Sequence, residues 1–170
     1  FEEVTVRRPE LDEAARNSIA VSVAIAAIRY DIVKISPEKS TVFNWKEALD
    51  FERQSGPYIQ YAHARACSIL EKAGDFSEAY DLKDPHGIAL AKHIAKFPAV
   101  IDEVVQELKP HVLATYAREL ADLFNAFYHY EPVLKSEGIT RQSRLTLVKA
   151  AKNTLKESLE SLGIDAISTM

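Results

Sequence analysis

Residues that bend or break helices are scarce in this sequence. Its 170 residues include only 5 glycines and 7 prolines. So few turn residues disfavour a β-sandwich or β-barrel and favour long helices. The single cysteine, Cys67, excludes a disulfide within the chain and fits a reducing compartment. We therefore expect an all-α protein of the cytoplasm.

Long hydrophobic runs are also missing. The most apolar stretch, residues 19–28, is interrupted by Ser22 and falls short of the roughly 18 residues that a membrane-spanning helix needs. No secretory signal opens the sequence, and its start without methionine suggests a fragment of a longer protein. We therefore expect no membrane contact.

Motifs for metal, nucleotide or catalytic chemistry are absent too. The five histidines lack H-E-x-x-H spacing, the cysteine has no C-x-x-C partner, and there is no G-x-x-x-x-G-K-[S/T] loop. Paired acids such as Asp102 and Glu103 suit a helix surface. We therefore expect no catalytic residue, no metal site and no cofactor in this chain.

Positive charge is in short supply, with 21 Lys and Arg against 25 Asp and Glu and a net charge of −4. A nucleic-acid-binding domain usually shows a basic footprint, so an RNA partner would require the cations to cluster. Lys149, Lys152 and Lys156 do share one stripe of a predicted helix. An ordinary solvated helix face would show the same stripe.

Hydrophobic spacing and capping residues predict a bundle of helices. The predicted helices cover residues 9–32, 57–72, 84–97, 98–108, 110–130 and 140–162. Before them we expect a frayed segment at residues 1–8.

Between the first two helices, residues 41–45 are β-prone and residues 46–51 predict one helical turn. Two single residues also carry expectations. Trp45, the only tryptophan, is expected in the core. Arg144 projects toward the apolar side of its helix, so we expect it to pair with a carboxylate or a carbonyl.

The most informative stretch is GPYIQYAHAR, residues 56–65. Gly56 permits a tight backbone, and Pro57 suits the first helical position. Tyr58, Tyr61 and Arg65 then fall on one stripe beside the core face of the helix. Two aromatic rings and a guanidinium can hold unstacked RNA bases, although tyrosines at a core edge often only pack.

This stretch resembles a motif of the arginyl-tRNA synthetase family, in which F-[D/N]-W leads through a short loop into G-P-Y-[I/L]-Q-Y-x-x-[A/S/T]-R. The chain has FNW at residues 43–45. AIAAIRY at residues 24–30 is similar to the family's G-x-G-A-[I/V]-[K/R]-Y helix, with alanines for the glycines. DLFNAFY at residues 122–128 resembles L-[F/H]-x-x-F-Y. The end, LGI followed by six residues to Met170, resembles L-G-I-x-x-P-E-x-M without its Pro-Glu.

The resemblance covers about residues 20–170 and implies two parts. Residues 1–50 would be the C-terminal end of the catalytic half, with a helix and the short β-prone segment. Residues 51–170 would be an all-α helical bundle, the DALR-type anticodon-binding domain. The implied partners are tRNA-Arg and the missing catalytic half, and we expect a monomer.

The parent enzyme would attach arginine to tRNA-Arg using ATP with Mg. This chain contains neither of the family's ATP-site motifs, H-x-G-H and K-M-S-K-S. We therefore expect the chain to be inactive as a ligase when alone.

The resemblance also implies which residues meet the RNA. The anticodon-binding set consists of Tyr58, Tyr61, Arg65, Tyr128 and Met170. The tRNA-contacting loop consists of Glu52, Arg53, Gln54 and Ser55. The three stripe lysines, Lys149, Lys152 and Lys156, would meet phosphates.

Two alternatives stay open. The chain could be an anticodon-binding module of another synthetase, such as the cysteinyl enzyme, or of a non-catalytic paralogue. It could also be a helical protein-interaction domain without an RNA role, which the acidic pI of about 5.8 favours.

Overall fold

Several helices begin at a polar side chain, as the sequence signals predict. The computed structural model describes residues 1–50 and 55–170. Asp12, Ser55 and Asp84 each accept a hydrogen bond from a backbone N–H three residues further on, at 2.8, 3.1 and 2.7 Å. The helices in the described part are α1 (Glu2–Arg7), α2 (Glu13–Val33), α3 (Trp45–Ala48), α4 (Gly56–Ala73), α5 (Pro85–Ile94), α6 (Phe97–Glu107), α7 (Pro110–Tyr130) and α8 (Gly138–Ser161).

The predicted all-α fold is confirmed, with helix ends that differ by a few residues from the sequence-based ranges. Two differences lie near the N-terminus. Residues 2–7 form α1 instead of a frayed segment. Residues 41–44 form neither strand nor helix, and the residues that the structure describes contain no strand at all. A β-prone segment becomes a strand only where another strand pairs with it.

Trp45 does not lie in the core, contrary to the expectation for a lone tryptophan. It is 61% exposed and begins the short helix α3. Its ring carries the Lys46 ammonium 5.6 Å from the centroid. The flanking segment, residues 41–47, is exposed throughout, so the ring has no buried surface to join.

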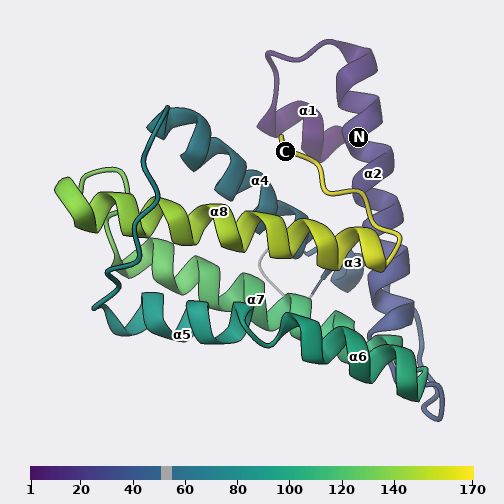
Figure 1. Cartoon of the computed structure of the whole chain (residues 1–170). Coiled ribbons are helices and arrows are strands. Elements are labelled where there is room, and N and C mark those ends of the chain that lie inside the picture. Colours follow the sequence, from purple (N-terminus) through teal and green to yellow (C-terminus); the bar gives the residue numbers. More distant parts are fainter. Residues whose placement is uncertain (51–54) are drawn as a thin grey trace.

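The core forms where α4, α7 and α8 meet. α4 packs against α2, α7 and α8, while α5 covers α7 and α8, and α6 covers α7. Figure 1 shows α5–α8 running across the picture and α2 standing nearly upright beside them. The largest fully buried side chains include Ile59, Leu90, Leu120, Phe124, Phe127, Leu145, Leu155 and Leu159. None of the helices in the described part is both long and apolar enough to cross a membrane.

A backbone contact joins α2 to the bundle. A Cβ at Gly56 would lie 2.2 Å from the carbonyl oxygen of Ala26, closer than real atoms approach. Glycine at the first residue of α4 is therefore required by this close approach rather than by an unusual φ. The contact fixes where the N-terminal region meets the helical bundle.

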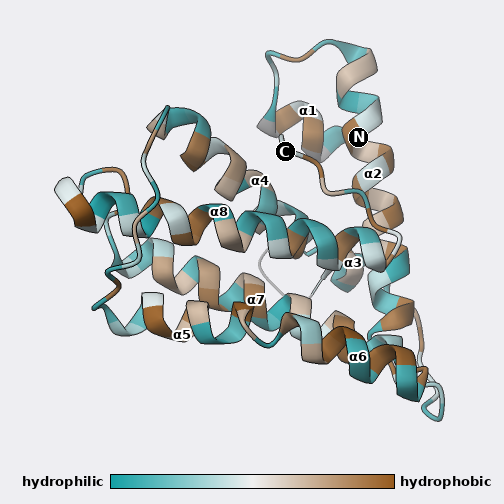
Figure 2. Cartoon of the chain, viewed as in Figure 1, coloured by the Kyte–Doolittle hydropathy of each residue, from teal (hydrophilic) through white to brown (hydrophobic). Residues whose placement is uncertain are grey.

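The outer side of α2 is apolar as well. Val21, Ile25, Ile28 and Ile32 recur at helical spacing and are 51%, 39%, 48% and 59% exposed. Figure 2 shows hydrophobic residues recurring along α2. These four residues form a continuous apolar stripe on the outside of α2, which we call the outer stripe. Adjoining exposed apolar residues are typical of an interaction surface.

The C-terminal tail, residues 163–170, turns back from α8 along α2. Gly163, with φ of +70°, allows the turn. Its N–H donates to the carbonyl of Glu160, and the N–H of Ile164 donates to the carbonyl of Leu159, both at 2.9 Å. Ile164 is then buried in the core at 1% exposure. Figure 1 shows the tail ending beside α1.

Candidate nucleic-acid interface

An arginine from α4 lies against two tyrosine rings. The guanidinium carbon of Arg65 is 4.7 Å from the ring centroid of Tyr61 and 5.5 Å from that of Tyr128. Arg65 Nη2 also donates to the Tyr61 hydroxyl at 3.1 Å. A guanidinium held against aromatic faces keeps its remaining donors in a fixed plane. α4 therefore supplies two of these groups and α7 supplies the third.

A chain of hydrogen bonds also holds the Arg65 guanidinium in place. Arg65 Nη1 donates to Asn125 Oδ1 at 2.7 Å, and Asn125 Nδ2 donates to the Tyr58 hydroxyl at 3.0 Å. That hydroxyl donates in turn to Asp122 Oδ1 at 2.8 Å. Burial raises the pKa of Tyr58, which keeps its hydroxyl protonated as a donor. We call Tyr58, Tyr61, Arg65, Asn125 and Tyr128 the tyrosine–arginine cluster.

Three members of the cluster, Tyr61, Arg65 and Tyr128, line a cleft of about 370 Å³, which we call the tail cleft. Its volume lies in the range of small-ligand pockets. One wall comes from α4, one from Tyr128 and Leu134, and one from the C-terminal tail. The lining residues of that tail wall are Ser168, Thr169 and Met170, with Arg8 beside them. An aromatic face, a guanidinium and hydroxyls together can hold a base by stacking and hydrogen bonding.

A second cleft of about 460 Å³ is also lined by Arg65 and Tyr128. We call it the loop cleft, because residues 132–135 of the α7–α8 loop form much of its lining. Asn125 and His129 complete it on the α7 side. Arg65, Tyr128 and Leu134 line both clefts, so the tyrosine–arginine cluster separates two adjacent hollows.

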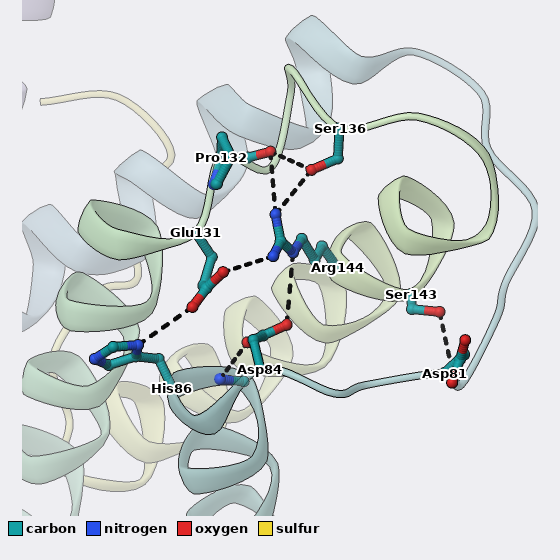
Figure 3. A network of polar contacts seen from close by, with 9 residues as sticks. Asp81, Asp84, His86, Glu131, Pro132, Ser136, Ser143 and Arg144 are labelled. Carbon is teal, nitrogen blue, oxygen red and sulfur yellow. Dashed lines mark hydrogen bonds and ion pairs between the residues drawn. The ribbon is translucent and has the colours of Figure 1, made fainter.

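The α7–α8 loop is held by a largely buried arginine, as expected for Arg144. Its Nη2 lies 2.5 Å from Glu131 Oε2, and its Nε forms a longer ion pair of 3.6 Å with Asp84 Oδ2. Its Nη1 donates to Ser136 Oγ at 2.8 Å. Figure 3 shows these groups converging on Arg144 from the start of α5, the end of α7 and the loop. The conformation of the α7–α8 loop, which lines the loop cleft, therefore depends on the Arg144 guanidinium.

The predicted anticodon-binding residues meet in the structure, with one distinction. Tyr61, Arg65, Tyr128 and Met170 all line the tail cleft. Tyr58 lines neither cleft and is half-buried, with its hydroxyl bonded to Asp122 and Asn125. Its hydroxyl therefore meets the cluster through Asn125, which in turn accepts from Arg65.

The predicted loop contacts lie mostly outside the described residues, since Glu52, Arg53 and Gln54 belong to the part that is not described. Ser55, the fourth, is 1% exposed and caps α4. Its hydroxyl accepts from the Tyr58 N–H and donates to the carbonyl of Asp50. Ser55 therefore caps α4, the helix that carries Tyr58, Tyr61 and Arg65.

The lysine row, Lys149, Lys152 and Lys156, lies on α8 and is partly paired. Lys149 Nζ is 2.7 Å from Glu78 Oε1, and Lys156 Nζ is 3.7 Å from Glu160 Oε1. Both pairs are about half exposed, so solvent weakens them. A phosphate could compete for either lysine.

Sequence reasoning did not single out Asp122 and Asn125 as members of the site. Helical periodicity distinguishes the buried face of a helix from the other face. It does not show which neighbouring helix contacts that other face. Asn125 lies three residues before Tyr128, on the same side of the helix. That spacing is the signal that could have identified it. Within the described part, no three His, Cys, Asp or Glu side chains gather as a metal site would require.

Known proteins share the sequence and the fold of this chain. Residues 59–170 match the DALR anticodon binding domain. The chain is 78% identical over 170 residues to an arginine–tRNA ligase of Methanoregula boonei, covering 100% of this chain and 30% of that protein. A similar ligase from Methanosphaerula palustris is 71% identical, with 100% and 31% covered.

Among solved structures, arginyl-tRNA synthetase of Thermus thermophilus superimposes with a TM-score of 0.94 at 38% identity, over 99% of this chain and 30% of that one. The chain thus spans about 30% of the length of the relatives that it matches. The family match covers α4 from Ile59 onward together with α7 and the tail, and hence most of the candidate site. The chain belongs to the DALR anticodon-binding domain family.

Proposed function

We propose that this chain is the tRNA-binding part of an arginine–tRNA ligase and holds the anticodon stem-loop of tRNA-Arg. The observation that carries the proposal is the tail cleft, where Tyr61, Arg65, Tyr128 and Met170 converge from α4, α7 and the tail. An unstacked anticodon base would enter between the aromatic rings and the tail. The fixed donors of Arg65 would then read its edge.

The rest of the predicted assignment follows from this proposal. The full protein attaches arginine to tRNA-Arg, with ATP and Mg bound by the half that lies outside this chain. Residues 1–50 belong with that half, which covers the outer stripe of α2 at Val21, Ile25, Ile28 and Ile32. The protein works as a cytoplasmic monomer, and the lysine row meets phosphates near the anticodon stem.

The test is a binding titration of the full-length protein with tRNA-Arg and with a tRNA of a different anticodon, at two salt concentrations. We expect tighter binding of tRNA-Arg, and a steep fall of both affinities with salt, because phosphate contacts release counterions. Equal binding of the two RNAs would refute anticodon recognition. Binding of neither would favour a protein-interaction domain.

A further inference from the structure

Two buried polar side chains of α4, outside the tyrosine–arginine cluster, hold the C-terminal tail. Gln60 is 0% exposed, and its Nε2 donates to the carbonyl oxygen of Asp165 at 2.8 Å. His63 is 3% exposed, and its Nδ1 lies 2.9 Å from the carbonyl oxygen of Ile167. A carbonyl can only accept, so Nδ1 carries the proton. Side chains buried this deeply need such partners, because an unpaired polar group is costly in the core.

The spacing of the two donors matches the spacing of the two acceptors. Residues three apart on a helix lie on one side, as Gln60 and His63 do. Carbonyls two apart in an extended chain point the same way, as those of Asp165 and Ile167 do here. A slip of the tail by one residue would turn both carbonyls away from α4. The pair therefore selects one register of the tail.

The tail is also anchored on both sides of these two hydrogen bonds. Upstream, Ile164 is anchored in the core at 1% exposure. Downstream, Arg8 Nη1 lies 3.4 Å from the carbonyl oxygen of Met170. The next three residues, Ser168, Thr169 and Met170, all line the tail cleft. A displacement at Ile167 would therefore reach Met170.

We propose that Gln60 and His63 are positioning residues that set the register of the C-terminal tail and so place Met170 in the wall of the tail cleft. The proposal rests on the proposed function, since both residues act on RNA only through the tail. The other groups around the His63 ring fit a structural role. Cys67 Sγ, also on α4, lies 3.8 Å from His63 Nε2, and Lys152, Lys156 and Glu160 of α8 act on the ring electrostatically.

The first test is a double-mutant cycle in the full-length protein, with the dissociation constant for tRNA-Arg as readout. Gln60→Met keeps the buried volume and removes the donor, and Met170→Ala removes the tail side chain. We expect each single variant to lower the affinity for tRNA-Arg by about threefold or more. The double variant should lose no more affinity than the single variant with the larger loss. Independent, multiplicative losses, or an unaffected Gln60→Met, would overturn the proposal.

The second test uses a conservative rescue at His63. Asparagine can present an N–H close to the position of Nδ1, whereas leucine cannot. We expect His63→Asn to bind tRNA-Arg like the wild type and His63→Leu to bind as weakly as Met170→Ala, at equal unfolding midpoints. Equal losses in both His63 variants would overturn the role of this hydrogen bond. This pair carries the test by itself if Gln60→Met does not fold.

Tyr61→Ala separates this inference from the proposed function. If neither Tyr61→Ala nor Met170→Ala changes tRNA binding, the tail cleft is not an RNA site and the proposed function fails. If those two variants lose affinity and the Gln60 and His63 variants do not, only the positioning role fails.

Discussion

The molecule holds its cations in two different ways. Arg65 and Arg144 each have several partners fixed by the fold. Arg65 lines both clefts, whereas Arg144 holds the loop that lines one of them. The lysine row lies on an open face, and Lys149 and Lys156 each have one exposed carboxylate as partner. A fixed guanidinium can read the shape and edge of a base, whereas an exposed ammonium attracts any phosphate. We therefore expect specificity to come from the tail cleft and general attraction of phosphates from the lysine row on α8.

The largest expected effect comes from removing the cation that supports the loop cleft. Arg144→Ala leaves Glu131 and Asp84 largely buried without their partner, so we expect the free energy of unfolding to fall by about 3 kcal/mol. Denaturant titration measures it. The matched control is Lys149→Ala, whose exposed pair with Glu78 is worth at most about 1 kcal/mol. Similar losses in the two variants would remove the distinction between the two kinds of cation.

Next in size is the loss of a stacking surface. Tyr61→Ala in the full-length protein should lower affinity for tRNA-Arg by about tenfold or more, because base stacking contributes about 1–3 kcal/mol. The fold should persist, since Tyr61 is only partly buried. Tyr80→Ala is the control, as Tyr80 is 79% exposed and lines neither cleft. Unchanged affinity in Tyr61→Ala would exclude it from the RNA site.

The lysine row should give a smaller effect of a different kind. Replacing Lys149, Lys152 and Lys156 by alanine should weaken binding of all tRNAs alike. Each lysine that meets a phosphate contributes about 0.7–0.9 to the slope of log K against log salt concentration. The preference for one anticodon over another should stay the same. A changed preference would mean that α8 also takes part in reading the sequence.

The smallest effect is a pH dependence at the tail. Burial, followed by Lys152 and Lys156, lowers the pKa of His63 below its ordinary 6.5, against the opposing effect of the Ile167 carbonyl. The unfolded chain therefore binds more protons at this residue, and stability is lost as pH falls through and below about 6.5. We expect His63→Asn to lose less stability over that range. An identical pH profile in the variant would show that His63 titrates normally.

Much of the fold is predictable from the sequence because it depends on local signals. The N-cap residue Asp84 and the core stripe of α7 each specify their helix without reference to distant parts. The tail cleft was predictable only in part. Tyr61 and Arg65 share a helical stripe, but the bonds from Gln60 and His63 to the tail join residues about a hundred positions apart. No local pattern shows such a contact.

The exposed Trp45 illustrates a further limit. Residue type predicts that a tryptophan is buried, yet here the residues around Trp45 are exposed and do not pack against the core. Arg144 is the opposite case, since the cost of burying a charge predicts its pairing with a carboxylate without showing which one. The cost of desolvation can be derived from the sequence, while the identity of the neighbour requires the fold.

The most direct measurement couples the cleft to the RNA sequence. The wild type and Tyr61→Ala full-length proteins are each titrated with tRNA-Arg and with a transcript that carries a changed middle anticodon base. We predict that the wild type prefers tRNA-Arg by about tenfold or more and that Tyr61→Ala loses most of this preference. The same preference in both proteins would contradict recognition of that base at the tail cleft.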